Sequence, residues 1–132
     1  MKGVKFKELI VHKDARGWLA EIFRPEDVEN TIKGQVTITT AFPGIIKANH
    51  YHKRKNEWYC ILKGKMKLVL KDMNNGNQEE VVLSEDKLQI LKIEPNIAHG
   101  FKNIGNDMLL LLMYIDEPFD SKEPDTFPET VI

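Results

Sequence analysis

Short runs in which apolar and polar residues alternate recur along most of the chain. Gly, Asn, Asp and Pro interrupt these runs, a pattern typical of strands separated by tight turns. One short helix is expected at Pro25–Asn30, because proline begins the segment and acidic residues follow it. Strands this short and numerous favour an all-β sandwich or small barrel. The predicted strands are Phe6–His12, Leu19–Arg24, Gly34–Ala41, Ile46–Tyr51, Glu57–Lys63, Lys65–Lys71, Glu79–Leu83, Gln89–Ile93, His99–Asn103 and Met108–Ile115.

The pattern changes near the end of the chain. Met108–Ile115 is apolar on both faces of the predicted strand, so a second sheet, the N-terminal strands or another subunit must cover it. We expect a dimer for this reason. From Glu117 onward the chain has three prolines and no alternation, which predicts that residues 119–132 form an extended tail that lies over the domain or is disordered. The predicted organisation is therefore a single β-domain over residues 1–118, followed by the tail.

Composition narrows the function classes. The 132 residues contain 19 Lys plus Arg and 20 Asp plus Glu, so no charge excess indicates a nucleic-acid or membrane partner. The one compact basic run, Lys53 to Lys55, is expected to be a solvated turn. A lone cysteine, Cys60, fits a reducing compartment, and the N-terminus has no apolar run typical of a signal peptide. A cytoplasmic protein is expected, and its longest apolar run is too short to span a bilayer.

The segment HYHKRKNEWYC, from His50 to Cys60, is the strongest chemical signal in the chain. Strand periodicity places His50 and His52 on one face, about 7 Å apart along the strand. Glu57 begins the next strand after a short turn and can face the same way. Two imidazoles and a carboxylate are ligands suited to a transition metal rather than to calcium or magnesium. A buried polar cluster without an ion is the alternative interpretation.

The spacing around these residues resembles the first sequence motif of the cupin superfamily. GIIKANHYHKRKNEWYCILKG, residues 44–64, matches that motif without a gap. EPNIAHGFKN, residues 94–103, resembles the second motif, although Glu94 and Asn96 replace its proline and glycine. Asparagine tolerates the left-handed backbone that such a turn requires. The resemblance implies a cupin jelly-roll barrel in which His99 is the fourth metal ligand.

A second resemblance narrows the chemistry. DARGWLAEIF, residues 14–23, together with NHYH and IAHGF, is similar to stretches of dTDP-4-dehydrorhamnose 3,5-epimerases. The resemblance implies that Arg16 and Glu21 contact the nucleotide part of a nucleotide-sugar substrate. It also implies that His50 is the base that removes a proton beside the sugar ketone, in a family without a metal. Three of the family's four catalytic positions differ here, where the chain has His52, Glu57 and Leu112. Tyr114 shares a strand face with Leu112.

A third resemblance covers nearly the whole chain. The C-terminal cupin of capsular polysaccharide assembling proteins has similar HYH, Glu and HGF stretches and a tail like PDTFPETV, residues 124–131 here. In that family the cupin binds zinc and epimerises C3 of a UDP-4-keto-6-deoxy-hexosamine. The resemblance implies a metal site formed by His50, His52, Glu57 and His99. Zinc is the preferred ion, with manganese, iron and nickel as alternatives.

These observations predict an epimerase or isomerase of a nucleotide-linked 4-keto-6-deoxy sugar in surface polysaccharide biosynthesis. The alternatives are a non-catalytic sugar-binding cupin and a metal-dependent cupin oxygenase. A histidine whose lone pair binds a metal cannot also accept a proton, so His50 is a ligand or a base but not both. If it is a ligand, Tyr59 and Tyr114 are the expected proton carriers.

Overall fold

The computed structural model of the chain describes residues 2, 8, 10–28 and 33–132. All of its sheet pairings are antiparallel, as expected for strands joined by short turns. The elements are β1 (Val11–Asp14), β2 (Gly17–Phe23), a short 3₁₀ helix (Pro25–Val28), β3 (Gln35–Ala41), β4 (Ile46–Tyr51), β5 (Glu57–Lys63), β6 (Lys65–Asp72), β7 (Gln78–Ser84), β8 (Leu91–Ile93), β9 (Ile97–Asn103), β10 (Leu109–Ile115) and β11 (Phe127–Pro128).

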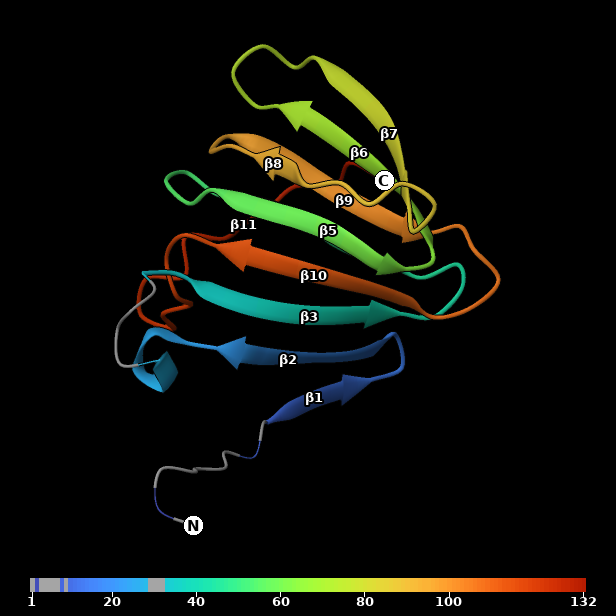
Figure 1. Cartoon of the computed structure of the whole chain (residues 1–132). Helices are drawn as coiled ribbons and strands as arrows, with labels where there is room; N and C mark the ends of the chain where they lie inside the picture. The colour runs from blue at the N-terminus through green and yellow to red at the C-terminus, as the bar shows by residue number, and fades with distance from the viewer. Residues whose placement is uncertain (1, 3–7, 9, 29–32) are drawn as a thin grey trace.

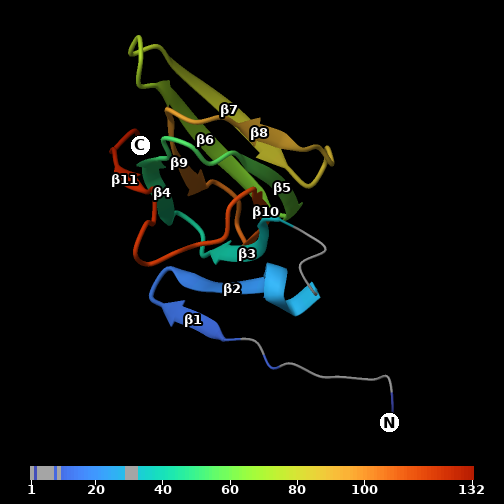
Figure 2. The ribbon, with the colours of Figure 1, turned by 90° about the vertical axis from the view of Figure 1, so that its left-hand side faces the viewer.

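The strands form two sheets that face one another (Figures 1 and 2). The first has the order β1-β2-β3-β10-β5-β8, and the second has the order β11-β4-β9-β6-β7. Sequence neighbours such as β4 and β5 therefore lie in different sheets. This arrangement is the all-β jelly roll that the sequence predicts. The short turn between β4 and β5 brings ligands from both sheets to one end of the interior.

The core fills the space between the two sheets. Its fully buried members include Leu109 and Leu111 from β10, Met66 and Leu68 from β6, and Phe101 from β9. They come from both sheets, and on β6 and β10 they sit two residues apart, as period-two strands require. The apolar packing is thus continuous with the wall of the cavity described below.

The predicted strands agree with the structure in their central parts. The first, Phe6–His12, lies partly outside the described residues, and the described strand β1 runs on to Asp14. The predicted helix is a 3₁₀ helix over Pro25–Val28, and residues 29–30 lie outside the described part. The strand β11 was not predicted, because a two-residue strand that includes a proline has no alternation to detect.

The tail lies along the barrel. Phe127 pairs with Tyr51 and Pro128 with His50, so β11 extends the second sheet beside β4. The Phe127 and Tyr51 rings stack with their centroids 5.4 Å apart. In the part of the chain that the structure describes, no helix has the length and apolar character needed to cross a bilayer.

Candidate metal centre

Four side chains from three separate segments converge inside the barrel. His50 comes from β4, His52 from the residue after Tyr51, Glu57 from the start of β5 and His99 from β9. One ligand atom from each lies within 4.8 Å of all the others. His52, Glu57 and His99 are buried, and His50 is half-buried. The structure thus brings together all four residues that the sequence predicts as metal ligands.

Backbone carbonyls fix the orientation of two of the imidazole rings. His52 Nδ1 lies 2.6 Å from the carbonyl oxygen of Asp125, and His99 Nδ1 lies 3.0 Å from that of Ile97. A carbonyl oxygen only accepts hydrogen bonds, so each Nδ1 carries the proton. In the neutral ring, Nε2 then has a free lone pair. Both Nε2 atoms face Glu57, at 3.4 Å for His52 and 2.8 Å for His99.

The convergent atoms lack aligned hydrogen-bond partners. Within the described residues, His50 Nε2, His52 Nε2, Glu57 Oε2 and His99 Nε2 are buried and make no hydrogen bond of good geometry. Buried polar atoms seldom lack a hydrogen-bond partner, and each of these four atoms has a lone pair directed toward the others. A cation satisfies such a cluster, and three imidazoles with one carboxylate suit zinc, manganese, iron or nickel. The residues therefore fit a transition-metal ion.

The protonation of the cluster also favours cation binding. Burial, assisted by the charge of His99, lowers the pKa of His50 to about 4, so this ring is neutral at physiological pH. Burial is the largest effect on Glu57 and raises its pKa, but the adjacent imidazoles of His52 and His99 outweigh it and hold the pKa below the ordinary range. A neutral imidazole and an ionised carboxylate are the forms that bind a metal.

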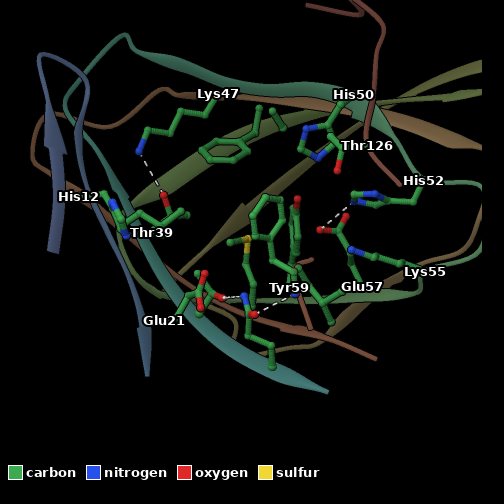
Figure 3. Close-up of a pocket in the computed structure, with 18 of the residues that line it drawn as sticks. His12, Glu21, Thr39, Lys47, His50, His52, Lys55, Glu57, Tyr59 and Thr126 are labelled. Atoms are coloured by element: carbon green, nitrogen blue, oxygen red, sulfur yellow. Dashed lines mark hydrogen bonds and ion pairs between the residues drawn. The ribbon is translucent and has the colours of Figure 1, made fainter. Parts of the chain in front are cut away.

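A cavity of about 520 Å³ opens from this cluster, a size typical of small-molecule sites. Figure 3 shows His50, His52, Glu57 and Tyr59 at one end and His12, Glu21, Thr39 and Lys47 at the other. The Tyr59 ring meets the His99 ring edge-on, with the centroids 5.8 Å apart. Burial, and then the charge of Glu57, raises the pKa of Tyr59 well above its ordinary value. Tyr59 therefore keeps its proton and can act as a donor.

The predicted nucleotide-contacting residues line the outer part of the same cavity. Arg16 stands in the turn before β2 and pairs with Asp14 at 2.6 Å. Glu21, on β2, forms an ion pair with Arg24. Lys47 lies in the same region and donates a hydrogen bond to Thr39 at 3.1 Å. This end of the cavity therefore carries two cationic side chains, Arg16 and Lys47.

Tyr114, one of the two expected proton carriers, does not line the cavity, so this prediction is wrong. On β10, Leu109, Leu111 and Met113 are buried in the interior, and Tyr114 alternates with them on the opposite face. There its ring contacts Trp58, with the centroids 5.4 Å apart. The sequence did not predict this orientation, because β10 is apolar on both faces and has no alternation to indicate which face is inside.

Sequence reasoning also missed two cavity lysines. Lys47 is three residues before His50, so strict alternation would place the two on opposite faces. Ala48 and Asn49 have φ of 69° and 59°, and they form a bulge that resets the alternation. Lys55, expected in a solvated turn, is only 3% exposed and lines the cavity, with Nζ 3.0 Å from the carbonyl of Pro124.

The second predicted motif forms its turn as expected. Asn96 adopts a left-handed φ of 64°, the conformation that glycine has in the general motif. Its backbone N–H donates to the carbonyl of His52 at 2.7 Å. The turn before β9 thus helps to hold the end of β4, where two of the ligands lie.

Comparison with known proteins identifies the family. Residues 12–127 match the polysaccharide biosynthesis C-terminal domain. The chain belongs to this family. It is similar to the spore coat polysaccharide biosynthesis protein SpsL of Bacillus subtilis, with 32% identity over 93% of this chain and 85% of that protein. It is also similar to the probable low-salt glycan biosynthesis epimerase Agl13 of Haloferax volcanii, with 29% identity over 92% of this chain and 83% of that protein.

Solved structures confirm the fold. The capsular polysaccharide assembling protein CapF of Staphylococcus aureus superposes with a TM-score of 0.84 and 31% identity over 93% of this chain. The chain covers only 35% of the length of that CapF chain. An oxalate decarboxylase variant of Bacillus subtilis superposes with a TM-score of 0.76 and 16% identity, which shows the shared cupin fold alone. The resemblances predicted from the sequence to cupins and to capsular polysaccharide assembling proteins are confirmed.

Proposed function

We propose that the protein epimerises or isomerises a nucleotide-linked 4-keto-6-deoxy sugar in surface polysaccharide biosynthesis. The observation that carries this proposal is one cavity joining a buried cation-binding cluster and a proton donor to a cationic outer end. The relatives support it. Agl13 is named as a probable epimerase of glycan biosynthesis. A Pseudomonas aeruginosa relative is named as a UDP-2-acetamido-2,6-beta-L-arabino-hexul-4-ose reductase and is 29% identical over 89% of this chain and 30% of that protein.

The sugar occupies the buried end of the cavity in this proposal. A metal held by His50, His52, Glu57 and His99, zinc by preference, would supply Lewis-acid polarisation of the ketone oxygen. Epimerisation removes one proton from the carbon next to the ketone and returns one to it; Tyr59 stands beside the cluster with its proton retained, so it is the donor for the return step. In the metal-loaded protein, the base that removes the first proton must be a cavity residue other than the four ligands. In the ion-free protein, His50 is neutral and its Nε2 can accept a proton, so His50 serves as the base only there.

The nucleotide diphosphate lies toward Arg16 and Lys47. Burial lowers the pKa of Lys47, and the nearby positive charge of Arg16 lowers it further. Two cations that repel each other at the same end of a cavity are stabilised when an anion binds between them. Glu21 lines the same end and is positioned to accept hydrogen bonds from the nucleotide.

The proposal includes a homodimer in the cytoplasm. On the outer face of the first sheet, Val36, Tyr114 and Trp58 lie opposite one another in one row, and Ile38, Leu112 and Cys60 in the next. These side chains form an apolar band that a second copy would cover. The single cysteine fits a reducing compartment. We expect light scattering to give twice the chain mass for the wild type and the chain mass for Leu112→Asp.

Solvent deuterium exchange tests the proposed activity. The protein is incubated in deuterium oxide with UDP- and dTDP-linked 4-keto-6-deoxy sugars, and each sugar is analysed by mass spectrometry and NMR. We expect deuterium at the carbon next to the ketone, with an inverted centre or a shifted carbonyl. Binding without exchange would instead indicate a sugar-binding cupin, and oxygen uptake with an iron-loaded protein would indicate an oxygenase.

A further inference from the structure

The tail motif PDTFPETV has no role in the chemistry described above, yet Asp125 within it contacts the metal centre. Its carbonyl oxygen is the acceptor 2.6 Å from His52 Nδ1. Nδ1 must carry the proton for Nε2 to present its lone pair to a cation. One carbonyl of the tail thus sets the tautomer and the orientation of a ligand that lies 73 positions earlier in the chain.

The carboxylate of the same residue holds the turn between two ligands. Asp125 Oδ1 accepts from the backbone N–H of Lys53 at 3.0 Å, and Oδ2 accepts from those of Arg54 at 3.1 Å and Lys55 at 3.2 Å. This turn connects His52 to Glu57, so its shape decides whether the two side chains converge. The Asp125 side chain is only 2% exposed, and a carboxylate buried so deeply needs such donors.

The backbone of Asp125 explains how one residue makes both sets of contacts. Its φ of 47° is left-handed, a conformation that Asp and Asn adopt more readily than other side chains. It allows the carbonyl and the carboxylate to face the same segment, residues 52–55. Any larger apolar residue here would lose the carboxylate contacts and also strain the backbone.

The rest of the tail is attached independently of Asp125. The N–H of Glu129 donates to the carbonyl of Asn49 at 2.9 Å, and the side chain of Asn49 binds the backbone of Val131 and Ile132. Glu129 also pairs with Lys71 at 2.6 Å. Removal of the Asp125 carboxylate therefore leaves the tail docked along β4. This separation lets an experiment distinguish the contact with the metal centre from docking in general.

We propose that Asp125 is a positioning residue of the metal centre, which orients His52 through its carbonyl and shapes the turn from His52 to Glu57 through its carboxylate. The inference rests on the proposed metal site. It assigns the tail a function beyond covering the barrel: the cation affinity of the cluster depends on a residue outside it. Partners of this kind typically contribute about 10- to 100-fold to metal affinity.

The test measures zinc affinity and cobalt absorption of the full chain. Zinc affinity is determined by competition with a chromophoric chelator, and cobalt(II) is added to the metal-free protein to record the visible ligand-field bands. For Asp125→Ala we expect zinc affinity to fall about 10- to 100-fold and the cobalt bands to shift. Asp125→Asn keeps the preference for a left-handed backbone and one acceptor oxygen, so its zinc affinity should lie between those of Asp125→Ala and the wild type. Glu129→Gln, the control on the same tail, should stay within about threefold of the wild type.

The outcomes separate this inference from the site on which it rests. Wild-type affinity and an unchanged cobalt spectrum in both Asp125 variants would overturn the role of Asp125 and leave the metal site intact. An equal loss in Glu129→Gln would also overturn it, because tail docking in general would then be responsible. If Asp125→Ala does not fold, as judged by circular dichroism, the spectrum of Asp125→Asn decides. A wild-type protein that binds neither ion overturns the metal site itself and this inference with it.

Discussion

The two ends of the cavity are built in different ways. At the buried end, His52, Glu57 and His99 are each at most 6% exposed, and backbone carbonyls orient two of the rings. At the outer end, the Arg16 and Asp14 side chains are 54% and 49% exposed and are held mainly by each other. Main-chain groups fix positions, whereas exposed side chains can rearrange. The difference suits a reaction at the buried end and adaptable binding of a charged group at the outer end.

The largest effect is expected from Tyr59→Phe at the buried end. Removing the hydroxyl removes the proposed proton donor, so we expect kcat to fall about 10²- to 10⁴-fold. The ring stays against His99, so metal affinity should be unchanged. Steady-state kinetics and metal titration of the same preparation check both parts. Tyr51→Phe is the matched control and should keep the wild-type kcat, because Tyr51 stacks on Phe127 instead of facing the cavity. Activity close to wild type in Tyr59→Phe would remove Tyr59 from the mechanism.

Glu57→Gln should produce the next largest effect. The change keeps the shape of the side chain but removes the one negative charge of the cluster. A structural zinc ion contributes about 10–16 kcal/mol over four ligands, so one ligand is worth about 3 kcal/mol, or about a hundredfold in affinity. Competition titration with zinc measures this. Glu21→Gln, a carboxylate at the other end of the cavity, should leave the affinity unchanged; a loss of equal size there would break the distinction between the two ends.

Metal affinity should also depend on pH. Burial is the largest influence on His52 and lowers its pKa, but the adjacent Glu57 carboxylate outweighs it and raises the pKa overall above the ordinary value of 6.5. A proton on His52 competes with the metal ion. Zinc affinity should therefore decrease as the pH falls through the His52 pKa, by up to about tenfold per pH unit. His50, with a pKa of about 4, is neutral over this interval and adds no slope. Zinc titrations between about pH 6 and 8 test this; a flat profile would contradict the assigned coupling between His52 and Glu57.

The smallest effect is expected at the outer end. Lys47→Met removes one of two cations that face the proposed diphosphate, at a cost of about 1 kcal/mol, or about fivefold in KM. The kcat value should change little, and added salt should raise the wild-type KM while affecting the variant less. Lys67→Met is the control, because Lys67 pairs with Glu80 away from the cavity. A loss in kcat with an unchanged KM would place Lys47 in the chemistry instead.

The sequence predicted the positions of some site residues and not of others. Spacing predicted that His50, His52 and Glu57 converge, because period-two strands and short turns constrain where these side chains point. His99 was added through the resemblance to the second cupin motif. Lys47 was missed and Tyr114 was assigned to the wrong face, because strand alternation did not determine where these two side chains point. A bulge at Ala48 and Asn49 changes the face on which Lys47 lies, and an apolar run such as β10 does not distinguish its two faces.

Asp125 could not be assigned from local pattern at all. Its partners lie 70–73 positions away, and the contacts depend on a left-handed backbone in a segment without regular alternation. Such long-range contacts follow from the tertiary fold, which brings the tail alongside β4. From the sequence, the tail motif PDTFPETV resembled the tail of capsular polysaccharide assembling proteins. The structure adds a physical role for that motif, because its Asp125 contacts His52 and the turn that follows.

The metal content of the protein tests the central claim most directly. The chain is purified without a chelating column, exchanged into metal-free buffer and analysed by inductively coupled plasma mass spectrometry. We expect close to one transition-metal ion per chain, with zinc predominant, and a loss of that ion in Glu57→Gln. A wild-type protein that contains no ion and takes up none when zinc, manganese, iron or nickel is added would contradict the account.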